Sequence, residues 1–155
     1  PHRADLIRKS AEKMGVTNLE TAAADSTVLN ETLRNSADAI ICDVPCSGIG
    51  IIRKKPDIRY KKQEDADGLP KIQLQILLNA LDYLKPGGRV VYSTCTVLEE
   101  ENQCVLREAL AIRKDCELEE FVLPGIGQVN GAITLWPQTH GTDGFFLARI
   151  KKKGG

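Results

Sequence analysis

Two cysteines occupy positions at which a thiol could do chemistry. Cys46 lies in the segment 43–48, DVPCSG, directly after an apolar run, and Cys95 ends a second apolar run in the same way. A thiolate is a strong nucleophile, and the free amides at the start of a helix stabilise it. A helix is predicted to begin just after Cys95. From the local sequence alone, either cysteine is equally well explained as a small residue in a tight turn.

The elements that position these residues are predicted from periodicity and turn signals. Strands are predicted over residues 19–24, 38–42, 89–93, 118–123 and 145–150, and helices over residues 4–14, 26–35, 70–84 and 96–112. Strands that alternate with helices indicate an α/β sheet, and such sheets bind ligands beyond the carboxyl ends of their strands. Asp25, Asp43 and Cys95 all lie at such ends, so the sequence predicts one shared crevice.

Local patterns add further expectations. The strand at 38–42 is apolar without alternation, which is typical of a strand buried on both faces. Thr96 and Glu99 have the spacing of a capping box, which predicts a helix start at Thr96. Residues 49–67 and 124–140 are predicted as loops, 143–144 as a turn, 99–101 as the acidic first turn of a helix, and 151–153 as a frayed tail.

The composition shows no global electrostatic preference. The chain has 155 residues, of which 42% are hydrophobic and 27% charged, and 21 Lys and Arg balance 21 Asp and Glu. One compact unit is expected at this length, and any nucleic-acid site must lie in a local cluster of charge. No apolar run reaches the roughly 18–20 residues of a membrane helix, and no signal peptide is recognised, so a cytoplasmic protein that contacts no membrane is expected.

Five cysteines, without paired C-x-x-C spacing, indicate free thiols rather than disulfides or a structural zinc site, and no metal is expected. Cys42, Cys104 and Cys116 are interpreted as core or surface residues because their neighbours are apolar or helical. A redox pair of Cys42 and Cys46 is disfavoured, because the spacing is C-x-x-x-C and Pro45 lies inside it.

Read in order, four motifs resemble those of the RNA cytosine-C5 methyltransferases of the Nol1/Nop2/Sun type, and among them the bacterial branch that acts on 16S ribosomal RNA. The motifs are DVPCSG at 43–48, Arg53 with PDIR at 56–59, STC at 93–95 followed by Glu100 and Asn102, and HGTDGFF at 140–146. The resemblance implies a Rossmann-like domain that uses S-adenosyl-L-methionine as cofactor. Amino-group methyltransferases, with an Asp/Asn-Pro-Pro-aromatic signature at the equivalent strand end, fit less well because Cys95 would have no role.

The same resemblance implies roles for individual residues. The thiol of Cys95 would attack C6 of the target cytosine, because C5 is a poor nucleophile until a covalent adduct forms at C6. Cys46 would assist loss of the C5 proton and release of the enzyme. Asp43 would lie beside the N3 and N4 edge of the cytosine, and Asp25 would contact the cofactor adenine. Asp43 is also expected, together with Asp25, among the cofactor-binding residues.

A basic segment follows the first cysteine motif. It carries Arg53, Lys54, Lys55, Arg59, Lys61 and Lys62 against one acid, Asp57. Taken alone, a run of charge is typical of a solvated loop. Beside a base-modifying site, contact with RNA phosphates is favoured, and binding would then depend on salt. A stacked cytosine cannot expose C6 to a thiol, so the target base is expected to be unpaired or flipped out.

The sequence departs from the family at its start. The Gly-rich cofactor loop and the acidic residue that holds the ribose are not found, so residues 1–155 are interpreted as a partial catalytic domain without its first two strands. Such a chain is expected to bind S-adenosyl-L-methionine weakly or not at all, and self-association is expected because central strand pairings are lost. The alternative interpretation is a non-catalytic module that binds RNA or assists assembly through the basic segment.

Overall fold

The computed structural model describes residues 2–60 and 67–154, and its centre is a five-stranded mixed sheet. The strands are β1 (Ala37–Asp43), β2 (Leu84–Thr94), β3 (Cys116–Leu118), β6 (Ala132–Leu135) and β7 (Phe145–Lys152), in the order β1-β2-β7-β3, with β6 also paired to β7. β1 and β2 are parallel, whereas β7 is antiparallel to its three neighbours. Because β1 and β2 are parallel, the two cysteine motifs that follow them lie at the same end of the strands.

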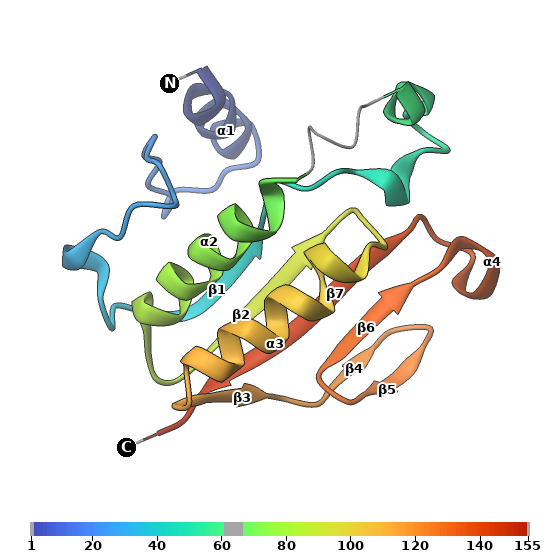
Figure 1. Cartoon of the computed structure of the whole chain (residues 1–155). Coiled ribbons are helices and arrows are strands. Elements are labelled where there is room, and N and C mark those ends of the chain that lie inside the picture. Colours follow the sequence, from blue (N-terminus) through green and yellow to red (C-terminus); the bar gives the residue numbers. More distant parts are fainter. Residues whose placement is uncertain (1, 61–66, 155) are drawn as a thin grey trace.

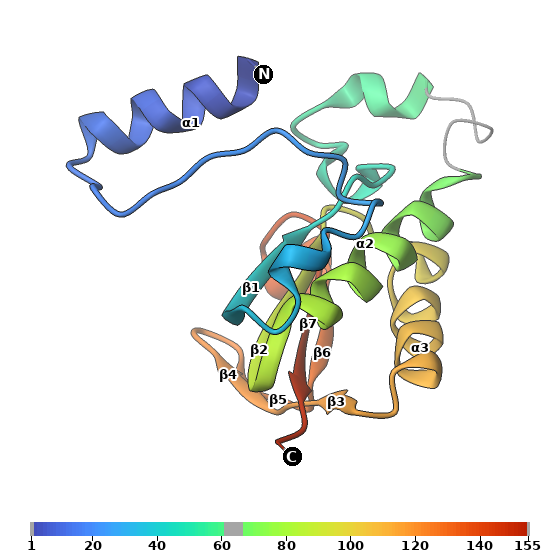
Figure 2. The ribbon, with the colours of Figure 1, turned by 90° about the vertical axis from the view of Figure 1, so that its left-hand side faces the viewer.

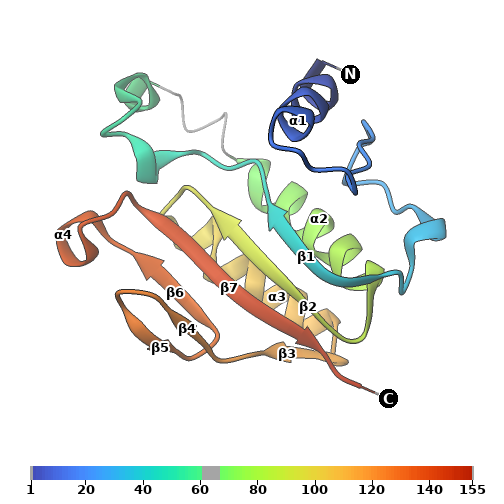
Figure 3. The same cartoon turned by 180° about the vertical axis from the view of Figure 1, so that it is seen from behind.

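Two helices cover one face of this sheet. α2 (Leu69–Tyr83) and α3 (Gln103–Ile112) lie side by side on it, and the view from behind shows the opposite face without a helix (Figures 1 and 3). Leu77 and Leu81 of α2 are fully buried against the strands, as their i, i+4 spacing predicts. Tyr92 of β2 and Phe146 of β7 pack edge to face with ring centroids 6.2 Å apart. The core therefore lies between one layer of helices and one face of the sheet.

The burial predicted for β1 is wrong, although the strand itself is confirmed. Cys42 points into the core, whereas Ile41 on the opposite face is 82% exposed. The uncovered face explains this difference, because the helices pack only against the side that Cys42 faces. Among the described residues, no strand pairs with the outer edge of β1.

The N-terminal segment shows how the predicted strand at 19–24 fails. The predicted helix is confirmed as α1 (His2–Lys13), followed by Gly15 in the left-handed region at φ 70°, but residues 19–24 form no strand. An extended segment becomes a strand only by pairing, and these residues have no ladder partner in the part of the chain described. The helix predicted at 26–35 is also wrong, because only Glu31–Leu33 forms a short 3-10 turn. α1 and this segment lie beyond the β1 edge (Figure 2).

The C-terminal region is more regular than the sequence predicts. The strand predicted at 118–123 is instead two strands, β3 and β4 (Phe121–Leu123), in different sheets. The predicted loop at 124–140 contains β5 (Gly127–Val129), which pairs with β4, and also β6 and the short helix α4 (Pro137–His140). Glycines with positive φ form the turns between these short strands, and their number gives this region the composition of a loop.

The predicted fraying of the tail is also wrong. β7 continues to Lys152, whose Nζ donates to the Leu84 carbonyl at 2.8 Å and to Asn35 Oδ1 at 2.9 Å. These contacts tie the end of β7 to the start of β2. In the described residues, no helix is both long enough and apolar enough to cross a membrane.

Candidate active site

The two cysteine motifs meet at the carboxyl ends of β1 and β2. Asp43, the last residue of β1, lies opposite Ser93 in the parallel register, so the chain leaves both strands at the same edge. The Sγ atoms of Cys46 and Cys95 lie 3.1 Å apart, and both cysteines are free and half-buried. The structure thus brings the two predicted thiols into one site.

The environment of Cys46 favours its protonated form. Burial raises the pKa of the Cys46 thiol to about 12, and its contact with Cys95 acts in the same direction. Near neutral pH, Cys46 therefore carries its proton. At this distance an S–H group of either cysteine can donate to the sulfur of the other, so a proton can pass between the two thiols.

A buried polar network holds the loop that carries Cys46. The side-chain amide of Gln73 on α2 donates to the Pro45 carbonyl at 2.9 Å and to Glu101 Oε2 at 2.7 Å. The same Glu101 oxygen accepts the backbone N–H of Ser47 at 2.9 Å. Glu101 is only 2% exposed and Gln73 is fully buried. The residues on both sides of Cys46 are thus fixed by side chains from elsewhere in the chain, which sets the direction of the thiol.

A second set of hydrogen bonds holds the turn at Cys95. Asn102 accepts from the Thr94 hydroxyl at 2.6 Å and donates to the Thr96 carbonyl at 3.0 Å, so it clamps the residues on either side of Cys95. The Thr96 hydroxyl also accepts from the hydroxyl of Ser47 at 3.0 Å, which joins the two cysteine loops. Both thiols are therefore held by groups that are themselves buried.

The helix start predicted at Thr96 is wrong. The Thr96 hydroxyl accepts the backbone N–H of Leu98, and a 3-10 turn at Glu99–Glu101 precedes α3, which begins only at Gln103. The acidic turn therefore does not open an α-helix. One of its acids, Glu101, is instead buried in the network beside Cys46, and no α-helix begins directly after Cys95 to stabilise its thiolate.

Two glycines bring a third segment against Cys95. The N–H of Gly50 donates to the Cys95 carbonyl at 3.0 Å, and the N–H of Gly144 donates to the Gly50 carbonyl at 2.8 Å. A Cβ at Gly50 would lie 2.0 Å from the Gly144 carbonyl oxygen and 2.9 Å from that of Cys95. Only glycine fits this close approach of three backbones. The predicted turn at 143–144 is therefore part of the wall around Cys95.

The basic segment lies next to this wall. Arg53 and Lys54 both form ion pairs with Asp143, at 3.3 Å and 2.5 Å. Lys54, and to a smaller extent Arg53, lowers the pKa of the Asp143 carboxyl below its usual range. Two cations share one carboxylate that is only 11% exposed, so a positive charge remains at the surface. Lys55 and Arg59 are exposed. Lys61 and Lys62 lie outside the described residues.

The two predicted cofactor carboxylates differ in setting. Asp43 is exposed where β1 ends. Asp25 is also exposed, and its Oδ1 accepts the backbone N–H of Thr27 at 2.9 Å and the Thr27 hydroxyl at 2.6 Å. These bonds lower the pKa of the Asp25 carboxyl. Carboxylate acceptors fit the hydroxyl and amino donors of a nucleoside cofactor.

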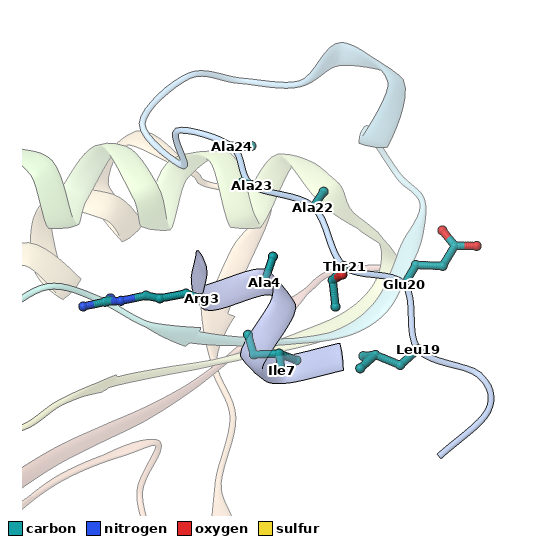
Figure 4. A pocket seen from close by; sticks show the side chains of 9 residues that line it. All are labelled: Arg3, Ala4, Ile7, Leu19, Glu20, Thr21, Ala22, Ala23 and Ala24. Carbon is teal, nitrogen blue, oxygen red and sulfur yellow. The ribbon is translucent and has the colours of Figure 1, made fainter. Parts of the chain in front are cut away.

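Asp25 comes directly after residues that line an open groove, and it does not lie beside the two thiols. The groove has a volume of about 700 Å³ and lies between α1 and residues 19–24. Figure 4 shows Ala4 and Ile7 of α1 on one side and Thr21 and Leu19 on the other. Of the residues predicted to share one crevice, the structure thus brings together Cys46, Cys95 and the end of β1, where Asp43 lies. Asp25 belongs to a separate, exposed segment.

The sequence analysis missed Gln73 and gave Glu101 the wrong setting. Gln73 lies four residues before Leu77 on the apolar stripe of α2, and a polar residue at a core-facing position is the signal that could have revealed it. Glu101 is one of three consecutive glutamates, so its type alone could not separate it from its exposed neighbours Glu99 and Glu100. In the part of the chain described, no cluster of three or more His, Cys, Asp or Glu could hold a metal ion.

Sequence comparisons show which proteins this chain resembles. The profile of the family described as 16S rRNA methyltransferase RsmB/F matches residues 1–151. The chain is 38% identical, over 163 aligned residues, to the probable ribosomal RNA small subunit methyltransferase B of Bacillus subtilis (strain 168), with 99% of this chain and 36% of that protein covered. It is 36% identical to the ribosomal RNA small subunit methyltransferase F of Aeromonas salmonicida (strain A449), covering 97% and 33%. The chain spans about a third of the length of these relatives.

Solved structures share the fold. PH0851 superposes with a TM-score of 0.89 at 28% identity, covering 97% of this chain and 35% of that one. NSun6 from Pyrococcus horikoshii with SFG gives a TM-score of 0.77 at 29% identity, covering 99% and 40%. A methyltransferase homolog protein from Pyrococcus horikoshii gives 0.77 at 32%, covering 97% and 50%. Each similarity includes nearly all of this chain and half or less of the other protein.

Proposed function

Because the chain belongs to the 16S rRNA methyltransferase RsmB/F family, we propose that it carries the two catalytic thiols of an enzyme that methylates C5 of a cytosine in 16S ribosomal RNA. The observation that carries the proposal is the 3.1 Å contact between the sulfur atoms of Cys46 and Cys95. Two thiols that lie at strand ends, in contact with each other and held by a buried network, suit a reaction that needs one nucleophile and one proton carrier.

Cys95 is the nucleophile in this proposal. Its thiolate attacks C6 of the cytosine, a C6–S bond forms, and the electrons of the C5=C6 double bond move toward C5 and N3. The carboxyl of Asp43, at the end of the neighbouring strand, hydrogen-bonds the N3 and N4 edge and stabilises the adduct. Carbon C5 becomes nucleophilic only in this adduct. The Cys46 S–H stabilises the Cys95 thiolate before attack by donating to it.

Cys46 acts in release. Elimination breaks the C5–H and C6–S bonds: the C5–H electrons restore the C5=C6 double bond, and the C6–S electrons leave with the sulfur of Cys95. Cys46 gives its own proton to the departing sulfur and takes the C5 proton, so one proton moves from the base to Cys95. The raised pKa of Cys46 supports this role, because the group is protonated when the step begins.

S-adenosyl-L-methionine, when bound, supplies the electrophilic methyl group. Asp25 and Asp43 would accept hydrogen bonds from its nucleoside part. A structural neighbour, NSun6 from Pyrococcus horikoshii, was solved with SFG, an analogue of this cofactor, which supports the assignment. The exposed cations at Arg53, Lys54, Lys55 and Arg59 would contact phosphates of the RNA, and a large salt dependence of binding is expected from them.

A denaturation-resistant complex with RNA tests the proposal. The protein is expressed from its whole reading frame and incubated with unmodified 16S ribosomal RNA and S-adenosyl-L-methionine. Cys46→Ala should accumulate a protein–RNA complex that survives denaturing electrophoresis, because attack proceeds and release does not. Cys95→Ala and the double variant should form none.

Cys104→Ala is the matched control, since Cys104 is also half-buried and free but lies on α3. It should turn over like the parent protein. Complexes with both single variants, or with neither, would show that the roles of the thiols are assigned wrongly. RNA binding without any complex or methylation would favour a non-catalytic RNA-binding module.

A further inference from the structure

A small cavity lies beside the wall around Cys95. Its volume is about 230 Å³, and it lies between the 3-10 turn Ile49–Ile51 and the start of α4. Typical ligand pockets measure ~300–1,000 Å³, so this space suits one planar ring rather than a whole cofactor. Its lining includes Arg53, Val97 and Trp136.

The cavity is lined by a residue that is hydrogen-bonded to the backbone of Cys95. Gly50 and Gly144 line it, and the same two glycines are hydrogen-bonded to each other and, through the Gly50 N–H, to the Cys95 carbonyl. Val97 lines it from two positions beyond Cys95. A ring bound there would therefore neighbour the cytosine attached to Cys95, but would occupy separate space.

Trp136 gives the cavity an aromatic wall. It is the only tryptophan among the 155 residues, and it remains 39% exposed although its size would favour burial. Its backbone is held in place: the N–H donates to Nδ1 of His140 at 2.9 Å, and the carbonyl accepts from the N–H of His140 at 2.8 Å. The indole is thus presented from a fixed position at little further loss of conformational entropy.

Charge adds a second feature on the same cavity. Arg53 lines it, and Arg53 and Lys54 together exceed the single carboxylate of Asp143 with which they pair. An aromatic surface next to excess positive charge is the combination that binds single-stranded nucleic acid, since bases stack on the ring and phosphates meet the cations.

We propose that this cavity binds the base of a nucleotide adjacent to the target cytosine, with the base stacked on Trp136 and its phosphate at Arg53. The proposal rests on the proposed function, because the RNA strand enters through the cytosine at Cys95. It assigns to Trp136 a role in binding and positioning the RNA, and it requires that the neighbouring base, as well as the target, leaves the helical stack.

The test measures equilibrium binding of a single-stranded RNA oligonucleotide that contains the target cytosine. Trp136→Ala should bind roughly tenfold more weakly, as expected when a stacked aromatic ring is removed, and Trp136→Phe should recover most of the affinity. Ile112→Ala is the control, because Ile112 is also exposed but ends α3, at the opposite end of the strands from α4 (Figure 1). It should bind like the parent protein.

Abasic RNAs separate stacking from a structural effect. When the nucleotide 5′ or 3′ of the target lacks its base, one of the two RNAs should bind the parent protein as weakly as Trp136→Ala binds the intact RNA. On that RNA the substitution should have no further effect. Equal affinity of parent and Trp136→Ala for intact RNA, or the same loss on every RNA, would overturn the proposal.

The covalent complex of Cys46→Ala keeps the two proposals distinguishable. If that variant traps RNA while Trp136→Ala binds normally, the subsite alone is wrong. If Cys46→Ala traps nothing but Trp136→Ala loses affinity that depends on the neighbouring base, the thiol chemistry is wrong and the subsite stands.

Discussion

The region that carries the thiols and the region that carries Asp25 are built differently. Every buried core residue lies at or beyond Cys42, whereas none of the residues described before Ala37 is buried. Residues before Ala37 make polar contacts with α2, such as the hydrogen bond from the Asn79 side chain to the Ser26 carbonyl at 2.9 Å and the ion pair of Arg34 with Asp82 at 3.0 Å. The thiol site is thus supported by the buried core of the same part of the chain. The segment that carries Asp25 contributes no residue to that core.

The largest difference between the regions should appear in core truncations. Leu81→Ala removes a fully buried side chain beneath the sheet and should lower the free energy of unfolding by about 2–5 kcal/mol. Leu6→Ala on α1, where the side chain is 50% exposed, should change it by less than about 0.5 kcal/mol. Urea unfolding of the protein expressed from its whole reading frame measures both. Comparable losses would mean that α1 is packed as firmly as the core.

Gly50 tests the close approach of backbones at Cys95. Gly50→Ala places a Cβ 2.0 Å from a carbonyl oxygen and should destabilise the protein by roughly 3 kcal/mol, the upper end of overpacking effects. It should also slow the formation of the covalent RNA complex, because the wall beside the thiol is displaced. Gly68→Ala, where no atom lies within 4 Å of the new Cβ, is the control. A Gly50→Ala variant with normal stability and normal rate would refute this account of the wall.

Glu101 tests the buried network beside Cys46. Glu101→Ala removes the buried carboxylate that accepts from the Ser47 N–H and from the Gln73 side-chain amide, which should lower the free energy of unfolding by roughly 2 kcal/mol. Glu100→Ala changes an exposed acid in the same 3-10 turn and should lie within about 0.5 kcal/mol of the parent. In a Cys46→Ala background, Glu101→Ala should also reduce complex formation. Identical behaviour of the two glutamate variants would exclude a special role for Glu101.

The smallest expected effect is a dependence on pH. Arg113, itself held by Asp82, lowers the pKa of the Asp115 carboxyl from 3.8 to about 2. A depressed pKa stabilises the folded state above the unfolded pKa, and this contribution is lost as the pH falls from about 4 to 2. Because Asp115 is half-exposed, solvent limits the effect to less than about 1 kcal/mol. Asp115→Asn should flatten the acid limb of a stability curve. The same change at Asp25, whose pKa is lowered only by its local and exposed partner Thr27, should flatten it less.

The confirmed predictions come from patterns that are local in the sequence. The family resemblance and the α/β fold class are confirmed, and so are β1, α2, β2, α3 in its later turns, and β7. Apolar runs and helical periodicity mark these elements because each packs one face against the same core. Parallel pairing then explains why two thiols 49 positions apart meet at one edge.

The wrong predictions depended on non-local partners. Residues 19–24 have strand-like composition, but a strand exists only when another strand pairs with it. Residues 127–135 read as a loop because glycines surround them, yet they pair with β4 and β7. Gln73 contacts Pro45, and Glu101 contacts Ser47, across 28 and 54 positions of sequence, so no short pattern could reveal these contacts.

The identity of the attacking thiol can be read directly from a peptide. The complex trapped with Cys46→Ala, or with an RNA whose target cytosine carries fluorine at C5 and so cannot lose a proton there, is digested with ribonuclease and trypsin. Cleavage after Arg89 and Arg107 places Cys95 in residues 90–107, and cleavage after Arg34 and Arg53 places Cys46 in residues 35–53. With the fluorinated RNA and the parent protein, mass spectrometry should find the nucleotide on Cys95 in the first peptide. A nucleotide on Cys46 in the second peptide would contradict the assignment of attack to Cys95.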